Sequence, residues 1–340
     1  MATIALRQQV GVPGARLAGI GAYRPETSVD STEIAARFGR TGEWVRERTG
    51  IVSRRFAAEG ETTGDMAIEA GARALCDAGV APSDVDLVIV ASCSTEASLS
   101  GLAATVASGL GAERAAGFDL NAACAGFCYA LAIAADAIRM GSARKVLVVG
   151  TEKMSSWVDK ADLGTSIIFG DGAGAAVLTE ADEPGIGPIV WGSDGAAAGL
   201  IEVPAGGLMA MQGQTVFRWA TTEIHPIALQ ACAKAGVRPD ELAAIVPHQA
   251  NLRIVEALAR KIGAPDAVVA RDVVESGNTS AASIPMALDR MITERMVKPG
   301  GLALLIGFGA GLTYAAQVVR MPLGVRRTNA LSTYAVMSGG

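Results

Sequence analysis

The stretch IIFGDGAGAAVLTE (167–180) has a counterpart near the other end of the chain, LIGFGAGLTYAAQVV (305–319). Each stretch contains an apolar run, a glycine-rich segment and a second apolar run. We therefore expect a strand, a turn and a second strand in each place. A pattern that repeats within one chain is typical of a fold built from two similar halves.

The segments upstream of the two stretches repeat as well. LVIVASC (87–93) and LAAIVPHQ (242–249) are apolar strand candidates that each follow a polar helix end. NAACAGFCYAL (121–131) and SGNTSAASIPMAL (276–288) each place small residues at the start of a helix. Apolar strands that alternate with helices predict an α/β fold in which the sheets are covered on both faces.

The repeat divides the chain into four predicted segments. Two halves at 16–182 and 183–322 would pack against each other as one five-layered body. An N-terminal tail at 1–15 and a C-terminal tail at 323–340 carry no matching pattern. Ends without a packing pattern are typically held loosely.

Composition excludes several classes of protein. Half of the 340 residues are hydrophobic and 19% are charged, which predicts a large core. No apolar run reaches the roughly 18 residues that a membrane span needs. Five cysteines are an odd number, which argues against a disulfide framework and for a cytoplasmic setting. A net charge of −5 without a basic tail predicts no nucleic-acid partner.

The segment RERTGIVSRR (46–55) concentrates positive charge in Arg46, Arg48, Arg54 and Arg55. One interpretation is a solvated face of the protein. The other is a rim that binds phosphates or an acidic partner.

Two cysteines lie four residues apart at the start of a predicted helix. Cys124 comes first, among alanines and a glycine, and Cys128 lies one turn further on. A thiol at a helix N-terminus meets unpaired N–H groups, which should lower its pKa and make it nucleophilic. The alternative is that both are small core residues, the common place of free cysteines. We expect no metal site, because no cluster completes a set of four ligands.

Three further segments carry polar groups or glycines at the ends of apolar runs. His248 ends a strand, where sites form in α/β sheets, although a lone histidine is often structural. Asn278 lies in a polar turn that also suits a helix cap. IGFGAGLTY (306–314) lacks a phosphate-loop signature, but its glycines allow backbone N–H groups to approach an oxyanion.

Together these motifs resemble the β-ketoacyl-acyl-carrier-protein synthase III family of the thiolase superfamily. The resemblance rests on the order of the matching segments along residues 16–320: EWVRERTGI (43–51), NAACAGF (121–127), IIFGDGAGAAVL (167–178), VPHQANLRI (246–254), SGNTSAAS (276–283) and GFGAGLTYA (307–315). CAGFCYAL (124–131) and TVFRWA (215–220) resemble segments of enzymes from aromatic-polyketide pathways in actinobacteria. The resemblance implies a five-layered αβαβα fold with two pseudo-equivalent halves, and a homodimer.

The resemblance also assigns roles to single residues. Cys124 would be the acylated nucleophile, and its backbone N–H would form an oxyanion hole with that of Ala310. His248 and Asn278 would stabilise the enolate that decarboxylation produces. The remaining predictions are Trp44, Arg48 and Asn251 for coenzyme A, Arg253 for the carrier protein, and Leu99 for the acyl pocket.

Three places depart from the family's commonest pattern. Leu163 stands where many relatives have an arginine that stacks on adenine, which leaves ordinary coenzyme A binding open. Leu99 and Ser100 replace an aromatic–proline pair, and the smaller leucine could admit a branched or longer acyl group. The stretch 193–214, where relatives build part of the acyl pocket, looks shortened.

The resemblance implies a decarboxylating Claisen condensation. Acyl-coenzyme A would load Cys124, and malonyl-acyl carrier protein would extend the acyl group, to prime a polyketide or a fatty acid. Coenzyme A thioester would be the substrate, with no cofactor. A plain acyltransferase is the alternative, a Cys–His hydrolase is disfavoured, and a non-catalytic partner subunit is disfavoured because Cys124 is present.

Overall fold

The computed structural model describes residues 11–95 and 99–324 of the chain, and its strands form two five-stranded sheets with the same architecture. In spatial order, sheet 1 contains β1 (Gly14–Tyr23), β7 (Asp171–Ala181), β6 (Lys145–Lys153), β4 (Leu87–Ala91) and β5 (Ala116–Leu120). Sheet 2 contains β8 (Val190–Ser193), β14 (Thr313–Arg320), β13 (Leu302–Phe308), β11 (Ala244–Pro247) and β12 (Val268–Val269).

The two sheets also share their strand directions. In each, the last three strands of this order are parallel and the first two are antiparallel to their neighbours. Strands β7 and β14, which carry the repeated sequence, therefore hold equivalent places. The internal repeat is confirmed as two equivalent sheets.

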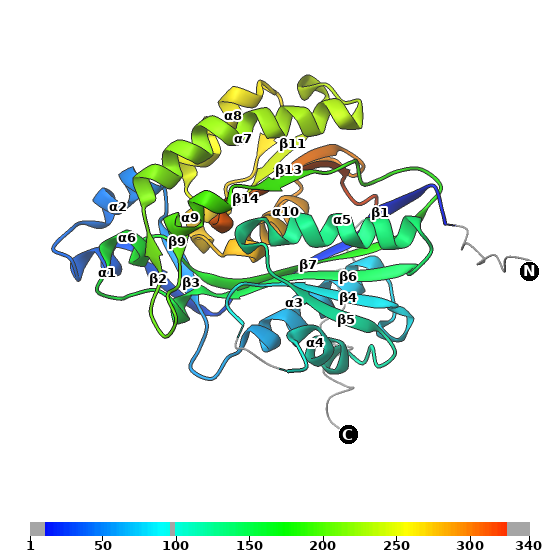
Figure 1. Ribbon diagram of the computed structural model, residues 1–340, viewed down its shortest axis with the longest axis horizontal. Helices are drawn as coiled ribbons and strands as arrows, with labels where there is room; N and C mark the ends of the chain where they lie inside the picture. Colours follow the sequence, from blue (N-terminus) through cyan, green and yellow to red (C-terminus); the bar gives the residue numbers. More distant parts are fainter. Residues whose placement is uncertain (1–10, 96–98, 325–340) are drawn as a thin grey trace, which may run out of the picture.

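Helices fill the three remaining layers of the molecule (Figure 1). The middle layer, between the sheets, contains α5 (Gly126–Arg139) and α10 (Ser283–Thr293). The outer face of sheet 1 carries α3 (Thr63–Ala78) and α4 (Leu102–Leu110), and that of sheet 2 carries α7 (Gly213–Ala235) and α8 (Leu252–Ile262). Each boundary between layers is an apolar cluster. The predicted five-layered αβαβα fold is confirmed.

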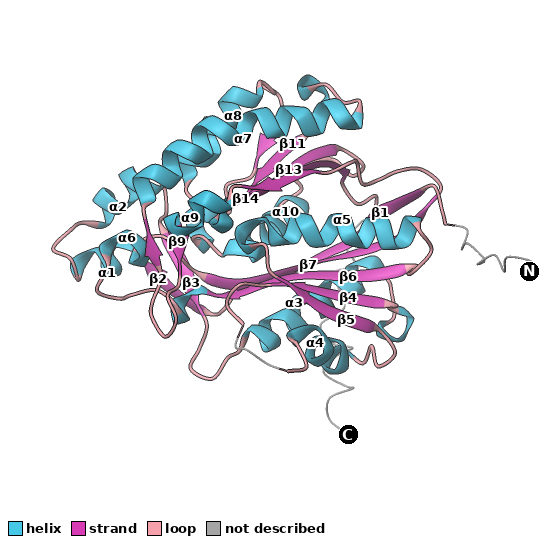
Figure 2. Cartoon of the chain, viewed as in Figure 1, coloured by secondary structure: helices cyan, strands magenta, loops and turns pink. Residues whose placement is uncertain are grey.

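Shorter elements cap one end of these layers, on the left in Figure 2. They are α1 (Ser31–Ala36), α2 (Gly42–Thr49), α6 (Leu163–Ser166), α9 (Val273–Ser276), β2 (Thr27–Asp30), β3 (Ser53–Phe56), β9 (Ile201–Glu202) and β10 (Ala210–Met211). Among the residues that the structure describes, no helix combines the length and apolar character needed to cross a membrane.

The prediction of a strand, turn and strand over 167–180 is wrong. Residues 167–170 are not in a strand, and the glycine-rich part belongs to β7 itself. Gly172 and Gly174 lie against α10: a Cβ on Gly174 would come within 2.7 Å of the Met286 nitrogen. These glycines therefore allow close helix–sheet packing, whereas those at 307–311 lie around a true turn between β13 and β14.

The structure contradicts two other expectations. The N-terminal tail expected at 1–15 ends earlier, because β1 begins at Gly14; residues 1–10 and 325–340 lie outside the described part. Arg54 does not belong to a solvated or anion-binding face, because its side chain is fully buried. Its guanidinium donates to the carbonyl oxygen of Ile167 at 2.7 Å and to the hydroxyl of Ser31 at 3.2 Å. Arg54 is thus a structural residue.

Candidate active site

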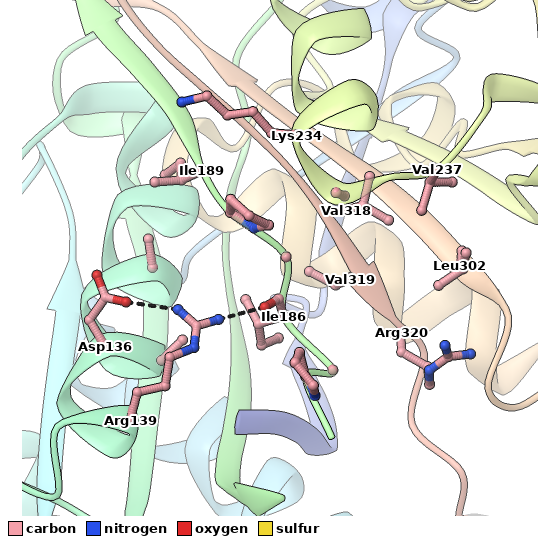
Figure 3. Close-up of a pocket in the computed structure, with 17 residues that line it drawn as sticks. Asp136, Arg139, Ile186, Ile189, Lys234, Val237, Leu302, Val318, Val319 and Arg320 are labelled. Carbon is pink, nitrogen blue, oxygen red and sulfur yellow. Dashed lines mark hydrogen bonds and ion pairs between the residues drawn. The ribbon is translucent and has the colours of Figure 1, made fainter. Parts of the chain in front are cut away.

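Two cavities in the structure were compared as candidates for the active site. The larger, about 660 Å³, lies near the C-terminal end of α5 (Figure 3). Its charged residues include Arg139, which pairs with Asp136 at 2.8 Å and donates to the carbonyl of Ile186. The smaller, about 490 Å³, is lined by Cys124, His248 and Asn278 together. Of the two, this second cavity combines a nucleophile with polar donors, so it is the candidate active site.

Cys124 lies in a 3-10 turn, Ala123–Ala125, that leads directly into α5. The preceding residue, Ala123, has a φ of 46°, which is uncommon for a residue with a side chain. Such strain is frequent at functional turns. Cys128, one turn into α5, is fully buried, as expected for a core residue.

The turn between β13 and β14 contacts the Cys124 thiol. Its sulfur accepts hydrogen bonds from its own backbone N–H and from that of Ala310. Gly309 permits this approach, because a Cβ there would lie 2.8 Å from the Cys124 sulfur. Two N–H groups thus converge on the place where an oxyanion bonded to this sulfur would form.

The expectation of a lowered thiol pKa at Cys124 is wrong. Burial raises the pKa of Cys124 to about 12, although hydrogen bonds from Ser280 and the two backbone N–H groups oppose the rise. Desolvation of the charged form outweighs the helix terminus. The uncharged thiol therefore predominates near neutral pH.

His248 follows β11 and lies in the wall of the cavity. Its Nδ1 is 2.7 Å from the Ser283 hydroxyl, and its ring contacts Phe308 edge to face. The Ser283 oxygen accepts the N–H of Gln249 at 3.3 Å, so its own proton is available to Nδ1. Burial lowers the pKa of His248 to about 3, which leaves a neutral ring. This tautomer carries its proton on Nε2 and can donate it.

Asn278 lies in the turn that precedes α10, opposite Cys124. Its side-chain oxygen accepts the N–H of Ser280 at 2.8 Å, which leaves the amide NH₂ as the donor toward the cavity. The backbone N–H of Asn278 donates to the carbonyl of Ile168 at 2.9 Å. The structure thus brings Cys124, His248, Asn278 and Ala310 together around one cavity.

The residues predicted for coenzyme A lie at or near the cavity. Asn251 lines it and donates to the backbone carbonyl of Arg48 at 3.3 Å. The Arg48 guanidinium stacks on the Trp44 ring at 4.1 Å, outside the cavity lining. Leu163 packs in the same apolar cluster as Trp44.

Arg253 and Leu99 differ in where the structure places them. Arg253, in the first turn of α8, stacks on Phe217 and faces a neighbouring groove. Leu99 is fully exposed and is not in the lining of the candidate site, so a single chain does not bring it to the acyl pocket. The stretch 193–214 does reach the cavity: Ile201, Val203 and Met209 line it.

Sequence reasoning missed two residues beside Cys124. Cys93, the last residue of a predicted apolar strand, lines the cavity because β4 ends two residues before it. Glu152 lies near the end of β6 and is fully buried next to Cys93. A charged residue at the end of an otherwise apolar strand was the signal for Glu152. No group of three or more potential metal-ligating side chains is found among the described residues.

Family models match this chain in both of its halves. Residues 118–195 match the family model 3-oxoacyl-[acyl-carrier-protein] synthase III, and residues 232–321 match the model of its C-terminal part. A β-ketoacyl-[acyl-carrier-protein] synthase III of Streptomyces coelicolor is 50% identical over 91% of this chain and 99% of its own length. The Mycobacterium tuberculosis enzyme is 49% identical over 92% of this chain and 98% of its own length.

A solved structure is similar as well. The priming β-ketosynthase of the R1128 polyketide biosynthetic pathway is 45% identical, with a TM-score of 0.91, over 94% of this chain and 99% of its own. Sequence and structure agree over nearly the whole described chain, including both sheets. The chain belongs to the β-ketoacyl-acyl-carrier-protein synthase III family.

Proposed function

We propose that this enzyme loads an acyl group from acyl-coenzyme A onto Cys124 and condenses it with malonyl-acyl carrier protein. The products are 3-oxoacyl-acyl carrier protein, carbon dioxide and free coenzyme A. The observation that carries the proposal is the convergence of one partly exposed thiol and four hydrogen-bond donors on a single cavity. We propose these roles for Cys124, Ala310, His248 and Asn278.

The first half-reaction stores the acyl group. The Cys124 sulfur attacks the thioester carbon, and the N–H groups of Cys124 and Ala310 stabilise the oxyanion that forms. The coenzyme A thiol leaves before the second substrate reacts, which predicts ping-pong kinetics.

The second half-reaction forms a carbanion equivalent. When the malonyl carboxylate leaves as carbon dioxide, negative charge moves onto the thioester oxygen as an enolate. The His248 Nε2–H and the Asn278 NH₂ are both donors in this geometry, so they stabilise this oxygen without taking a proton. The enolate carbon then attacks the acyl carbonyl carbon on Cys124. The bond from that carbon to the Cys124 sulfur breaks, and the sulfur takes up a proton from solvent to regenerate the thiol.

The cavity wall beyond Cys124 supports an apolar acyl group. It is lined by Met154, Trp157, Ile168, Phe169, Ile201, Val203, Met209, Met211, Val216, Phe217, Ile254 and Phe308. Several of these side chains are flexible methionines, which adapt to differently shaped groups. We propose that the enzyme uses an apolar starter group to prime a polyketide or fatty acid chain.

Two surfaces near the cavity support the predicted substrate contacts. Arg48, Trp44 and Asn251 would hold the nucleotide end of coenzyme A, since Asn251 connects the cavity to α2. Arg253 shares its groove with three further basic residues and two acidic ones, so that positive charge is in excess: Arg46, Arg260, Lys261, Glu47 and Glu256. A positive groove beside the entrance suits an acidic carrier protein.

The free edge of sheet 1 supports a homodimer. Within the described residues β5 pairs only with β4, and its residues are mostly exposed, with Phe118 at 41%. Exposed strand edges of this kind pair readily with another chain. Sedimentation tests the proposal: the wild type should be a dimer and Phe118→Asp a monomer, whereas a monomeric wild type would contradict it.

Intact-protein mass spectrometry tests the main proposal. A panel of acyl-coenzyme A donors should add one acyl mass to the wild type and none to Cys124→Ala. Malonyl-acyl carrier protein should then remove that mass and release carbon dioxide. Acylation that persists in Cys124→Ala would refute the nucleophile, and acylation without decarboxylation would favour the alternative, a plain acyltransferase.

A further inference from the structure

Arg24, the residue after β1, connects the two helices that flank Asn278. Its guanidinium pairs with Asp272, which precedes α9, at 2.9 Å, and with Asp289 of α10 at 3.2 Å. It also donates to the backbone carbonyl of Met286, in the first turn of α10, at 2.8 Å. Asn278 lies in the turn between these helices. One side chain therefore binds the chain on both sides of a residue of the candidate site.

The ion pairs of Arg24 are shielded from water. The side chain of Asp272 is 2% exposed, and those of Asp289 and Arg24 are 11% and 22% exposed. Pairs in such surroundings are screened little by salt, and loss of one partner leaves a buried charge uncompensated. Arg290 also pairs with Asp272, at 2.7 Å, so a part of the compensation is shared. Without Arg24, the two carboxylates would lose the positive charge that lies between them and would repel each other.

The position of α10 determines where the Asn278 amide points. The backbone of Asn278 is held from one side, because its N–H donates to the Ile168 carbonyl at 2.9 Å and its carbonyl accepts the Gly170 N–H at 3.0 Å. The side-chain oxygen is held from the other side, by the Ser280 N–H at 2.8 Å. Ser280 begins a 3-10 turn that leads directly into α10. A shift of α10 would therefore turn the amide relative to the cavity.

The nucleophile is held by other segments. Cys124 lies in the turn before α5 and meets the turn between β13 and β14 at Gly309. Among the described residues, Arg24 forms no hydrogen bond or ion pair with either of these turns, and it does not line the cavity. Its influence on the two half-reactions should therefore differ.

We propose that Arg24 is a positioning residue for Asn278, an inference that rests on the proposed function. By binding Asp272, Asp289 and the Met286 carbonyl, it fixes α9 and α10 relative to each other. This arrangement directs the Asn278 NH₂ at the enolate oxygen of the second half-reaction. Loss of Arg24 slows decarboxylation, which uses Asn278, much more than acylation, which uses the backbone N–H groups beside Cys124.

Single-turnover measurements of the two half-reactions test this role. Arg24→Met keeps the length of the side chain and removes its charge. Decarboxylation of malonyl-acyl carrier protein by fully pre-acylated enzyme should fall about ten- to a hundredfold, since a misplacement of about 1 Å can cost that much. Acylation by acyl-coenzyme A should stay near the wild-type rate. A smaller fraction of folded protein would lower both rates by the same factor, so the ratio of the rates separates positioning from stability.

Arg139→Met is the matched control. Arg139 is 29% exposed, pairs with an aspartate at 2.8 Å and donates to a backbone carbonyl, as Arg24 does. It lies at the C-terminal end of α5, whereas Cys124 precedes the N-terminal end. This variant should keep the wild-type ratio of the two rates. Arg24→Lys restores a charge between the carboxylates but lacks the planar fork, so its decarboxylation rate should lie between those of Arg24→Met and the wild type.

The outcomes separate this inference from the function on which it rests. Equal losses in both half-reactions of Arg24→Met, or a wild-type rate of decarboxylation, overturn the role of Arg24 alone. If Arg24→Met does not fold, Arg24→Lys decides: a selective loss of decarboxylation supports the role, and a wild-type ratio overturns it. A wild type that no acyl-coenzyme A acylates refutes the proposed function, and this inference with it.

Discussion

Ser283 determines which nitrogen of His248 carries the ring proton. A neutral imidazole has one donor and one acceptor nitrogen, and only the donor stabilises an enolate oxygen. When the Ser283 hydroxyl donates to Nδ1, 2.7 Å away, the ring proton lies on Nε2. Asn278 is oriented by the same principle, because the Ser280 N–H occupies its side-chain oxygen. At the residue scale, Ser283 and the Ser280 N–H thus determine which atoms of His248 and Asn278 can donate a hydrogen bond.

The variant Ser283→Ala tests whether Ser283 keeps the ring proton of His248 on Nε2. Without the hydroxyl, Nδ1 can take the ring proton and Nε2 becomes an acceptor. We expect decarboxylation by pre-acylated enzyme to fall about ten- to a hundredfold, the effect of about 1–3 kcal/mol for one buried hydrogen bond. Acylation of Cys124 should change less.

Nitrogen-15 NMR of His248 provides the control for that experiment. The wild type should show the Nε2–H tautomer with no protonation between about pH 5 and pH 8, since burial lowers the pKa to about 3. The same tautomer in Ser283→Ala, together with an unchanged rate, would contradict the assignment.

At the scale of elements, α10 packs directly on β7 because β7 carries glycines. A Cβ on Gly174 would lie 2.7 Å from the Met286 nitrogen and 2.8 Å from Pro285. Both neighbours belong to the first turn of α10, so they cannot move aside singly. Because α10 follows the turn with Asn278, this packing also positions the site.

The variant Gly174→Ala tests the contact. Overpacking of this kind should lower the free energy of unfolding by about 1–3 kcal/mol. Thermal unfolding followed by circular dichroism measures the change. The control is Gly195→Ala, where a Cβ would meet nothing within 4 Å; equal stability of the two variants would contradict the role of Gly174.

At the scale of the whole molecule, the equivalent halves place two helix starts against each other. The turn before α5 carries Cys124, and the turn before α10 carries Ser280 and follows Asn278. These turns contact each other although about 150 residues separate them in the chain. The cavity reaches α8 at Ile254, and Arg253 of the same helix faces the neighbouring groove.

The charge of that groove leads to a prediction about the carrier protein. Arg253→Glu should lower kcat/KM for malonyl-acyl carrier protein about tenfold at low salt, and the difference should shrink as salt screens the charges. Acylation by acyl-coenzyme A should fall less. Arg144→Glu, an exposed arginine on the N-terminal side of β6, is the control; an equal, salt-independent loss in both variants would argue against docking at Arg253.

The sequence alone was sufficient for the fold and for the family. Periodic apolar runs reveal buried strands and helices, because burial imposes those spacings locally. The ordered motifs also identified Cys124, His248 and Asn278 as residues that the structure brings to one cavity. The sequence is enough for this step, because a motif shows directly which residue type stands at the end of a strand or at the start of a helix.

Only the tertiary structure decided the pKa values, the burial and the packing of these residues. The pKa of Cys124 depends on burial by distant segments, which local sequence near a helix start does not contain. The burial of Arg54, the place of Cys93 in the cavity and the packing role of Gly174 likewise depend on residues far along the chain. Desolvation and close packing are properties of all the neighbours in space, and the fold alone brings those neighbours together.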